Sequence, residues 1–420
     1  MKKAVSVFIA IRYLWGKAHE GVRYLRGAAA GIAVSLVPII VTLIVADGMI
    51  RGIMDRYLEF GSGHLQIFNY FNDDDMDETK RIVNSIKSVR GIWHEQRTMG
   101  VLAGKEGKAG VTVRSIDASF WDDPKSKPFL KIIDGDNKLI SDRDIVLGET
   151  LAQNIGANVG DTVRLMTIKA DDGRMSPRTA AFTVKGILSC GYNELDALWC
   201  ITNREGGSRI ISNDRLSSSF LVKISDPYKD ADISAMEIRM ELGNGYSVYT
   251  WKRLLSSQYK SYETTRQILL FIMALIVIVA AVNVSSATSM LVLERQRDIA
   301  VLKVTGSSVK GVTSVFLWGG FFTGLTGSVI GISIGLLIGV NINTLIRSLE
   351  KVLSFFSGLF NGGEVKILDP GFYLEIIPII IDWKAVFIIG FFAVLCSVLA
   401  SWIPAVKAGK IKPMELLRKT

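Results

Sequence analysis

The sequence predicts an α-helical membrane protein with four transmembrane helices and a large mixed α/β domain outside the cytoplasm, inserted between helices 1 and 2. Of the 420 residues, 49% are hydrophobic, and the mean hydropathy is +0.32. This balance is too apolar for an ordinary soluble enzyme and too polar for a chain that lies wholly within a bilayer. Four long uncharged runs are separated by polar regions, and basic residues gather beside their ends.

Composition divides the chain into nine segments. In order, they are a cytoplasmic N-terminal segment (1–26), a first span (27–47), the α/β domain (48–265), a second span (266–293), a cytoplasmic charged helix (294–311), a third span (312–346), a second external loop (347–384), a fourth span (385–403) and a cytoplasmic tail (404–420). Each span provides the roughly 20 apolar residues that a helix needs to cross about 30 Å of hydrocarbon. Four such runs argue against buried helices of a soluble core.

The basic residues predict the orientation. Segments 1–26, 294–311 and 404–420 together carry fifteen Lys and Arg and four Asp and Glu, so they exceed the whole chain's net charge of +9. Because Lys and Arg mark cytoplasmic loops, these three segments and both termini are expected inside. The pI of about 9.3 therefore reports topology, and no nucleic-acid partner is expected.

The N-terminal residues 4–15, "AVSVFIAIRYLW", read as an amphipathic helix along the cytoplasmic face, or alternatively as an extension of the first span. The first span is not expected to be a cleaved signal peptide, because its leader is long and its apolar run has the length of a full span.

The domain at 48–265 reads as mixed α and β, with room for two lobes. Alternation and Gly or Asp turns predict strands at "HLQIFNYF", "GVTVRSID", "RDIVLG", "GDTVRLMTI" and "AFTVKGIL". The acidic stretch "DDDMDETKRIVNSIKSV" is expected to open a helix with Ile82, Val83, Ile86 and Val89 on one face, its carboxylates capping the helix instead of binding a cation. In the loop at 347–384, "LFNGGEVKILDPGFYLEIIP" suggests a turn, a strand and an extended stretch.

Cysteine and histidine usage suggests no metal site. The three histidines are scattered, and Cys396 lies within the last span. Cys190 and Cys200 fall in the external domain, where they are either bridged or two free buried thiols.

The third span carries glycine at every fourth residue, namely Gly327, Gly331, Gly335 and Gly339, with Gly320 and Gly324 before them. This spacing places glycine on one helix face and lets another helix approach closely. The partner is either another span of this chain or a second chain.

The chain offers no energy source of its own. The span interiors hold no Asp, Glu, Lys, Arg or His, which argues against an ion-coupled transporter. A P-loop needs G-x-x-x-x-G-K-[ST], and the nearest match, Gly306 to Gly311, is followed by Val312 and Thr313 and lacks the lysine. No catalytic residue set is suggested by the spacing, so the chain is not expected to be an enzyme, and another subunit must supply the work.

The stretch "ERQRDIAVLKVTG", 294–306, suits such a subunit. As a helix it places Ile299, Leu302 and Lys303 on one face, with charges nearby, and Gly306 ends it. It joins two spans, so movement of a docked partner would pass to both. The expected docking residues are Glu294, Arg295, Arg297, Asp298, Ile299, Leu302, Lys303 and Gly306. The alternative is a solvated loop.

Several stretches resemble a known family. "LVLERQRDIAVLKVTGSS" (291–308) and "PAVKAGKIKPMELLR" (404–418) resemble macrolide-exporter-type ABC permeases, the FtsX-like superfamily. Five further stretches resemble its lipoprotein-releasing branch, the Lol-type permeases: "VFIAIRYLWGK", "DIVLGETLAQNIGANVGDTVRL", "FTVKGILSCGYNELD", "AAVNVSSATSMLVLERQRDIAVLK" and "GFYLEIIP". Thr305 and Lys412 depart from the usual pattern.

The resemblance implies a bacterial inner-membrane complex. Two permease chains, identical or paired with a relative, would sit on a cytoplasmic ABC ATPase dimer that binds ATP and Mg, leaving this chain without a cofactor. An acylated lipoprotein would leave the membrane lipids for a periplasmic carrier. Its acyl chains would lie between the first and second spans of the two permeases, where this chain offers Val37, Ile40, Leu43, Ile44, Ile268, Phe271 and Leu275. The alternatives are a permease for drug or peptide efflux and a signalling permease acting on a periplasmic hydrolase.

Overall fold

The computed structural model describes residues 8–10, 20–69, 76–171, 174–211, 218–243, 245–359, 374 and 376–411. The chain forms two compact units, and each is described by itself. The helical unit comprises Met1–Gly48, Glu263–Val365 and Ile377–Thr420, and the β-rich unit comprises Met49–Tyr262 and Lys366–Ile376. Of the N-terminal helix expected at 4–15, only residues 8–10 are described, and they are helical; the tail beyond 411 lies outside the described residues.

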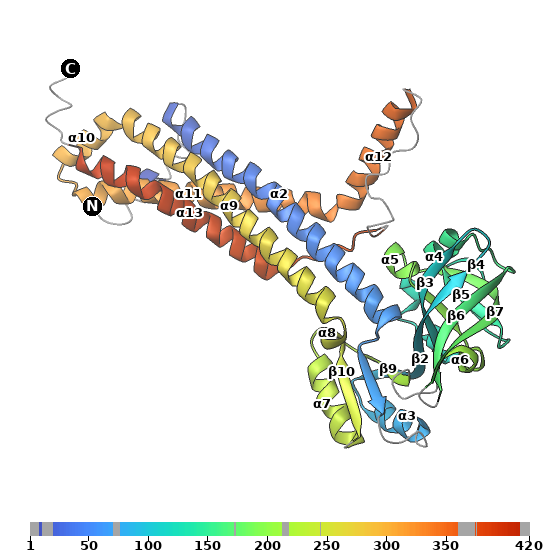
Figure 1. Ribbon diagram of the computed structural model, residues 1–420. Coiled ribbons are helices and arrows are strands. Elements are labelled where there is room, and N and C mark those ends of the chain that lie inside the picture. Colours follow the sequence, from blue (N-terminus) through green and yellow to red (C-terminus); the bar gives the residue numbers. More distant parts are fainter. Residues whose placement is uncertain are drawn as a thin grey trace. The chain divides into compact units, whose positions relative to one another are not determined.

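The described part of the chain contains four helices that are long and apolar enough to cross a membrane, which confirms the predicted number of spans. They are α2 (Glu20–Arg56), α9 (Ser256–Glu294), α11 (Val309–Val340) and α13 (Trp383–Lys410) (Figure 1). Two shorter helices accompany them, α10 (Gln296–Val304) and α12 (Ile342–Leu359). Helix α12 lies where the sequence predicted the end of the third span and the first part of an external loop, so this prediction was wrong. The third apolar helix ends at Val340 because Asn341 leaves the helical conformation and caps it.

Glycine determines how α11 packs. A side chain at Gly327 or Gly331 would meet the backbone of α2 at Ala29 or Ala33, and one at Gly324 would meet Ser397 of α13. These contacts bring two helices of this chain against the glycine face, so the partner left open by the sequence is shown to be intrachain. The apolar residues of α2, α9 and α13 form one continuous cluster beside this interface.

The β-rich unit is built on one ten-stranded sheet in the order β10-β1-β9-β2-β3-β8-β5-β7-β4, with β6 pairing β2 and β7. The β3–β8 and β5–β7 pairs are parallel and the others antiparallel. The strands are β1 (Leu65–Asn69), β2 (Val89–Ala103), β3 (Lys108–Ile116), β4 (Lys131–Gly135), β5 (Asp144–Gly148), β6 (Thr162–Asp171), β7 (Arg174–Ser189), β8 (Trp199–Thr202), β9 (Ser218–Ile224) and β10 (Tyr246–Thr250). The five predicted strands are therefore confirmed.

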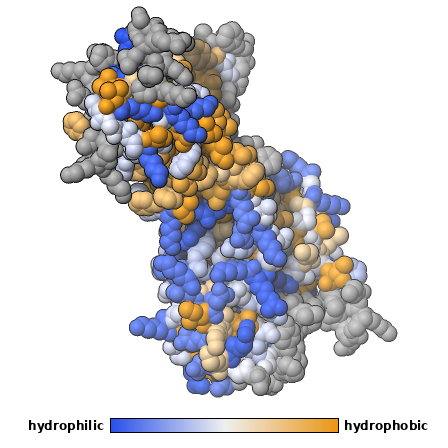
Figure 2. All heavy atoms as spheres, turned by 90° about the vertical axis from the view of Figure 1, so that its left-hand side faces the viewer, coloured by the Kyte–Doolittle hydropathy of each residue, from blue (hydrophilic) through white to orange (hydrophobic). Residues whose placement is uncertain are grey.

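Helices cover this sheet and complete separate hydrophobic clusters. They are α3 (Met76–Ser85), α4 (Glu149–Ile155), α5 (Asn193–Asp196), α6 (Arg204–Ile210), α7 (Ala231–Leu242) and α8 (Trp251–Leu254), with a π-helical turn η1 (Tyr57–Gly61) and 3-10 turns η2 (Ala118–Asp122) and η3 (Lys127–Phe129). One cluster lies around β5, β6, β7 and α4, and another around β1, β9, β10 and α7. A third cluster, which includes Trp93, Phe120 and Leu188, belongs to the same sheet, and the unit is one compact body. The face of this unit seen in Figure 2 is mainly hydrophilic.

Helix α3 begins close to where the acidic stretch predicted it. Asp77 and Glu78 lie in its first turn, while residues 73–75 lie outside the described part of the chain. Val83 and Ile86 are buried as expected, whereas Val89 is the first residue of β2. The carboxylates of the first turn thus sit at the positive end of the helix dipole.

Candidate functional site

Helix α10 is anchored on one side by apolar packing. Ile299 is buried in a cluster whose other buried members come from the ends of four long helices, and Ala300 next to it is also buried. Those members include Leu25 of α2, Leu291 of α9, Phe316 of α11 and Ala408 of α13. A displacement of α10 would therefore be transmitted to all four of these helices.

Polar contacts fix the ends of α10. Arg295 Nη1 donates to Asp298 Oδ2 at 3.1 Å, and Lys303 Nζ donates to the carbonyl of Ile411 at 2.6 Å. Gly306 has φ +93°, a left-handed conformation that glycine adopts without strain and that ends the helical stretch. Ser308 Oγ then accepts from the amide of Gly311 at 3.1 Å and caps α11.

The opposite side of α10 is open. Val301 is 62% exposed and Val304 70% exposed, and both share a helix face with exposed Arg297. Figure 2 views the end of the helical unit that carries α10 and shows hydrophilic and hydrophobic atoms mixed on it. Exposed apolar side chains rimmed by charge are typical of a protein-binding surface. We call Arg297, Asp298, Val301, Val304 and Thr305 the α10 patch.

The structure separates the predicted docking residues into two groups. Ile299 is buried, Leu302 is half-buried, Arg295 pairs with Asp298 in the first turn, and Lys303 ties the helix to Ile411. Glu294, Arg297, Asp298 and Gly306 are exposed. Sequence reasoning followed the apolar stripe that includes Ile299 and missed Val301 and Val304. Their spacing of four and seven residues from Arg297 is the signal that could have revealed them.

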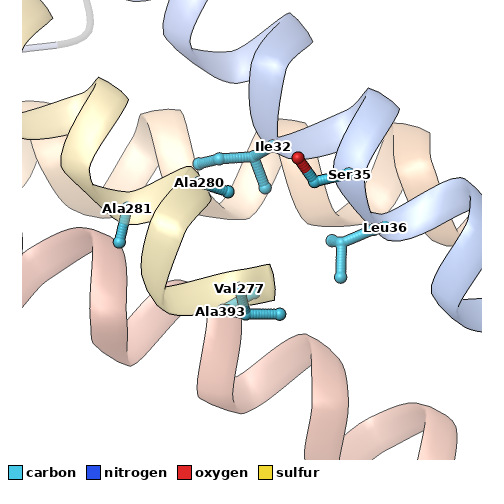
Figure 3. Close-up of a pocket in the computed structure, with 7 residues that line it drawn as sticks. All are labelled: Ile32, Ser35, Leu36, Val277, Ala280, Ala281 and Ala393. Atoms are coloured by element: carbon cyan, nitrogen blue, oxygen red, sulfur yellow. The ribbon is translucent and has the colours of Figure 1, made fainter. Parts of the chain in front are cut away.

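Helices α2, α9 and α13 cross closely (Figure 3). Ile32, Ser35 and Leu36 of α2 face Val277, Ala280 and Ala281 of α9 and Ala393 of α13, and the space between them is too narrow for a water molecule. Small side chains allow this approach in the same way as glycine does on α11. The crossing is a packed interface and cannot hold a ligand in this conformation.

The predicted cavity residues of the first span lie inside the helical unit. Ile40, Leu43 and Ile44 are 0%, 3% and 1% exposed. Ile40 and Ile44 pack on Gly335 and Gly339 of α11, and Val37 is half-buried beside them. The glycine face of α11 thus covers the larger side chains of α2.

The predicted cavity residues of the second span lie on the surface of α9. Ile268, Phe271 and Leu275 are exposed, Phe271 by 66%. A single chain therefore does not bring the two predicted groups together. Between residues 31 and 48 of α2 the exposed residues are Val34, Pro38 and Thr42, which recur every four residues, and Val34 is 72% exposed. Sequence reasoning favoured the bulkier residues and missed this stripe.

Three helices are joined by an ion-pair network at one end of the helical unit. Arg266 of α9 lies 3.0 Å from Asp47 of α2 and donates to Asp382, the N-cap of α13, at 2.6 Å. Burial raises the pKa of Asp382, but the hydrogen bond and charge of Arg266 together with the amides of Lys384 and Ala385 lower it by more, so the pKa lies below its usual value. Nothing in the apolar pattern predicted this network.

Buried charges in the β-rich unit compensate one another. Lys223 is fully buried, with Nζ 3.1 Å from both Glu59 and Asp123, and Arg90 lies 2.8 and 2.7 Å from the same carboxylates. Burial lowers the pKa of Lys223, and the two carboxylates oppose this shift. Glu59 and Arg90 also line an open cavity of about 540 Å³. The two cationic side chains neutralise the two carboxylates, so we interpret this cluster as structural.

Both external-domain cysteines are free. Cys190 and Cys200 belong to different hydrophobic clusters, which resolves the alternatives in favour of two buried thiols. Burial raises the pKa of Cys200 to about 12 and that of Cys190 well above its usual value. Neither thiol is therefore a reactive nucleophile at neutral pH.

The fold and the α10 patch together indicate the class of protein. Four apolar helices, a large α/β domain between the first two, and a charged helix between the second and third are the features of a multi-pass membrane permease. The family description "FtsX-like permease C-terminal" matches residues 270–413, and "MacB-like periplasmic core domain" matches 27–237. The chain therefore belongs to the family of proteins with a MacB-like periplasmic core domain, and its C-terminal part matches the FtsX-like permeases.

Curated relatives extend over the whole chain. The lipoprotein-releasing system transmembrane protein LolC of Xylella fastidiosa (strain Temecula1) is 28% identical over 439 residues, covering 100% of both chains. LolC of Neisseria meningitidis is 27% identical and covers 99% of both, and LolE of Haemophilus influenzae is 23% identical and covers 98% of both. The periplasmic region of MacB from Actinobacillus actinomycetemcomitans is similar with a TM-score of 0.29 and 16% identity, covering 49% of this chain and 96% of that one.

Proposed function

We propose that the chain is the permease subunit of an ABC transporter that extracts acylated lipoproteins from the bacterial inner membrane. The observation that carries this proposal is the full-length similarity to proteins named for lipoprotein release, 28% over 100% of both chains. The chain itself is not an enzyme in this account. ATP and Mg are bound by a separate cytoplasmic ATPase dimer.

The α10 patch is the proposed ATPase contact. Both termini and α10 lie in the cytoplasm in this proposal, because their segments hold the excess of Lys and Arg. Exposed Val301 and Val304 supply the apolar centre, and Arg297 and Asp298 supply charge at the rim. The buried contacts of Ile299 carry movement of the ATPase to the long helices.

The lipid path is proposed to run along the exposed faces of α2 and α9. Ile268, Phe271 and Leu275 keep their proposed role on α9, while Val34, Pro38 and Thr42 replace Ile40, Leu43 and Ile44 on α2. Acyl chains need apolar surface that a second permease chain can close, identical or related, and the exposed residues satisfy that requirement. A periplasmic carrier would receive the lipoprotein from the core domain.

Photo-crosslinking in cells tests this proposal. A photoreactive amino acid at Val34 or Phe271 should capture an acylated lipoprotein, and more of it when the ATPase is inactive. A probe at Phe387 of α13, which is 75% exposed, is the control for general lipid exposure. A probe at Arg297 should capture the ATPase.

The alternatives give different patterns. Capture of drugs or peptides at Val34 and Phe271 would indicate efflux, and capture of a periplasmic hydrolase by the core domain would indicate signalling. If Val34 and Phe271 yield only the phospholipid that Phe387 yields, the lipoprotein assignment is contradicted even where Arg297 still captures an ATPase.

A further inference from the structure

Helix α12 is amphipathic along its whole described length. At 100° per residue, Leu345, Leu349, Val352, Leu353 and Phe356 fall on one face. Arg347, Glu350 and Lys351 fall on the other half of the helix, with the two basic residues near its centre. The sequence of this helix is therefore that of an element with one apolar and one aqueous side.

Among the described residues, none packs a hydrophobic cluster against the apolar face of α12. The five residues of this face are exposed, with Leu349 at 52% and Phe356 at 57%. Within the described ranges, no residue of α12 belongs to a hydrophobic cluster. Figure 1 shows that α12 turns away from the bundle instead of continuing along α11. Five exposed apolar side chains on one helix face would be unfavourable in water.

Hydrogen bonds hold the first turn of α12 beside the end of the bundle where Gly48 of α2 lies. The side-chain amide of Asn343 donates to the carbonyl of Ile377 at 2.9 Å, and its oxygen accepts from the amide of Ile377 at 3.1 Å. The following residue, Pro378, lies directly against Gly48 of α2. A contact of this closeness requires glycine at position 48.

The charged residues beside Gly48 indicate that this end of the bundle lies at the membrane surface. Gly48 follows Asp47, which pairs with Arg266 at the start of the apolar part of α9, and Arg266 also pairs with Asp382 before α13. Charged groups at the starts of apolar runs lie at the bilayer surface. Trp383, the first residue of α13, is 56% exposed, as expected for an aromatic side chain at the interface.

We propose that α12 is an interfacial helix that lies in the plane of the outer leaflet, with its apolar face in the acyl boundary and its basic face toward the lipid phosphates. Its 18 residues would extend for about 27 Å along the membrane surface. The last turns of α11, which precede α12 in the chain, also expose apolar side chains, Leu337 and Val340. This inference rests on the spans and on the proposed orientation, and it is independent of the transported cargo.

The charge of α12, in addition to the exposed apolar residues at the end of α11, favours a lipid surface over a protein partner. Arg347 and Lys351 are exposed near the centre of the polar face, where they can reach lipid phosphates from the aqueous side. An apolar groove on a second chain would not require basic residues there.

Spin-label accessibility tests the proposal. The full-length chain, with Cys396→Ala, is reconstituted in nanodiscs of phosphatidylethanolamine and phosphatidylglycerol; Cys190 and Cys200 are buried and remain unlabelled. Nitroxides are placed singly at Leu349→Cys, Phe356→Cys, Arg347→Cys or Lys351→Cys. Collisions with oxygen should exceed those with a water-soluble nickel complex at 349 and 356, and the ratio should invert at 347 and 351.

Two outcomes overturn the proposal. High nickel accessibility at every position would place α12 in water. Low accessibility to both reagents at 349 and 356 would place a protein there. A second set of variants covers the case in which a label disturbs the helix. The nitroxide is placed at Val352→Cys, and Leu349→Asp or Lys351→Asp is added. Leu349→Asp should make the label less accessible to oxygen and more accessible to nickel, whereas Lys351→Asp should change neither.

Discussion

Ser397 Oγ on α13 donates a 2.7 Å hydrogen bond to the carbonyl of Gly320 on α11. The bond crosses between two helices at the point where glycine lets their backbones approach. A Cβ at Gly320 would lie 2.7 Å from the Cβ of Ser401, closer than real contacts allow. Small residues and a serine hydroxyl thus hold these helices together without a hydrophobic driving force.

Gly320→Ala should therefore destabilise the helical unit. Overpacking of a tight interface costs about 1–3 kcal/mol, and thermal unfolding in detergent or nanodiscs measures the loss. Gly319→Ala is the matched control, because a Cβ there meets no atom within 4 Å. Equal stability of the two variants would show that the α11–α13 contact is looser than described.

Val301→Asp and Val304→Asp should weaken ATPase binding and leave the fold intact. Both side chains are exposed, so a carboxylate costs the free permease little, whereas a charge at the centre of an interface costs about 2 kcal/mol, or roughly 30-fold in affinity. Co-purification with the ATPase and stimulation of ATP hydrolysis are the measurements.

Ile299→Ala separates packing from docking. Ile299 is buried, so its truncation should lower the unfolding temperature, by contrast with the two valine variants. Unchanged ATPase binding in both valine variants would show that the α10 patch is not the docking surface.

Arg266→Gln should loosen the end of the bundle where α2, α9 and α13 meet. The variant leaves Asp47 and Asp382 without their cation, but Arg266 is 40% exposed, so we expect a loss of only about 1 kcal/mol. Arg266→Lys is the conservative control and should recover part of the loss.

The same network should respond to acid. The folded pKa of Asp382 is below its ordinary value, so the stability it contributes is present above about pH 4 and is lost as the pH falls through the folded pKa. Unfolding of the native chain measured from neutral to acidic pH should show this loss, and Arg266→Gln should show less of it. Parallel pH profiles of the two proteins would contradict the assignment.

Cys190 and Cys200 should resist thiol reagents in the folded protein. Burial raises both pKa values, so at about pH 8 almost no thiolate is present at either site. Maleimide labelling followed by mass spectrometry should modify neither residue before denaturation. After denaturation without a reductant both should react, and failure to react would reveal a disulfide.

The spans and the strands of the core domain followed from the sequence because their patterns are local. An uncharged run of sufficient length or an alternating run with turn residues needs no knowledge of its neighbours. The glycine spacing of α11 likewise predicted close packing. The sequence could not tell that Gly335 faces Ile40 of the same chain, since that depends on tertiary contacts.

The candidate site was predicted less well, because the exposure of its residues depends on tertiary contacts. Ile299 and Ile40 look like binding residues because they are apolar and well placed in sequence, yet both are covered by neighbouring helices. The exposed Val301, Val304 and Val34 become visible only once the packed face of each helix is known. The pairing of Asp47 with Arg266 joins residues more than two hundred positions apart, which no local pattern reports.

Release of a lipoprotein from proteoliposomes tests the central claim most directly. The permease complex with its ATPase is reconstituted with a labelled acylated lipoprotein and a soluble periplasmic carrier. We expect ATP to move the lipoprotein from the vesicles to the carrier, and Val304→Asp to reduce this transfer while the vesicles retain the same amount of permease. Sustained ATP hydrolysis with no lipoprotein leaving the membrane would contradict the account.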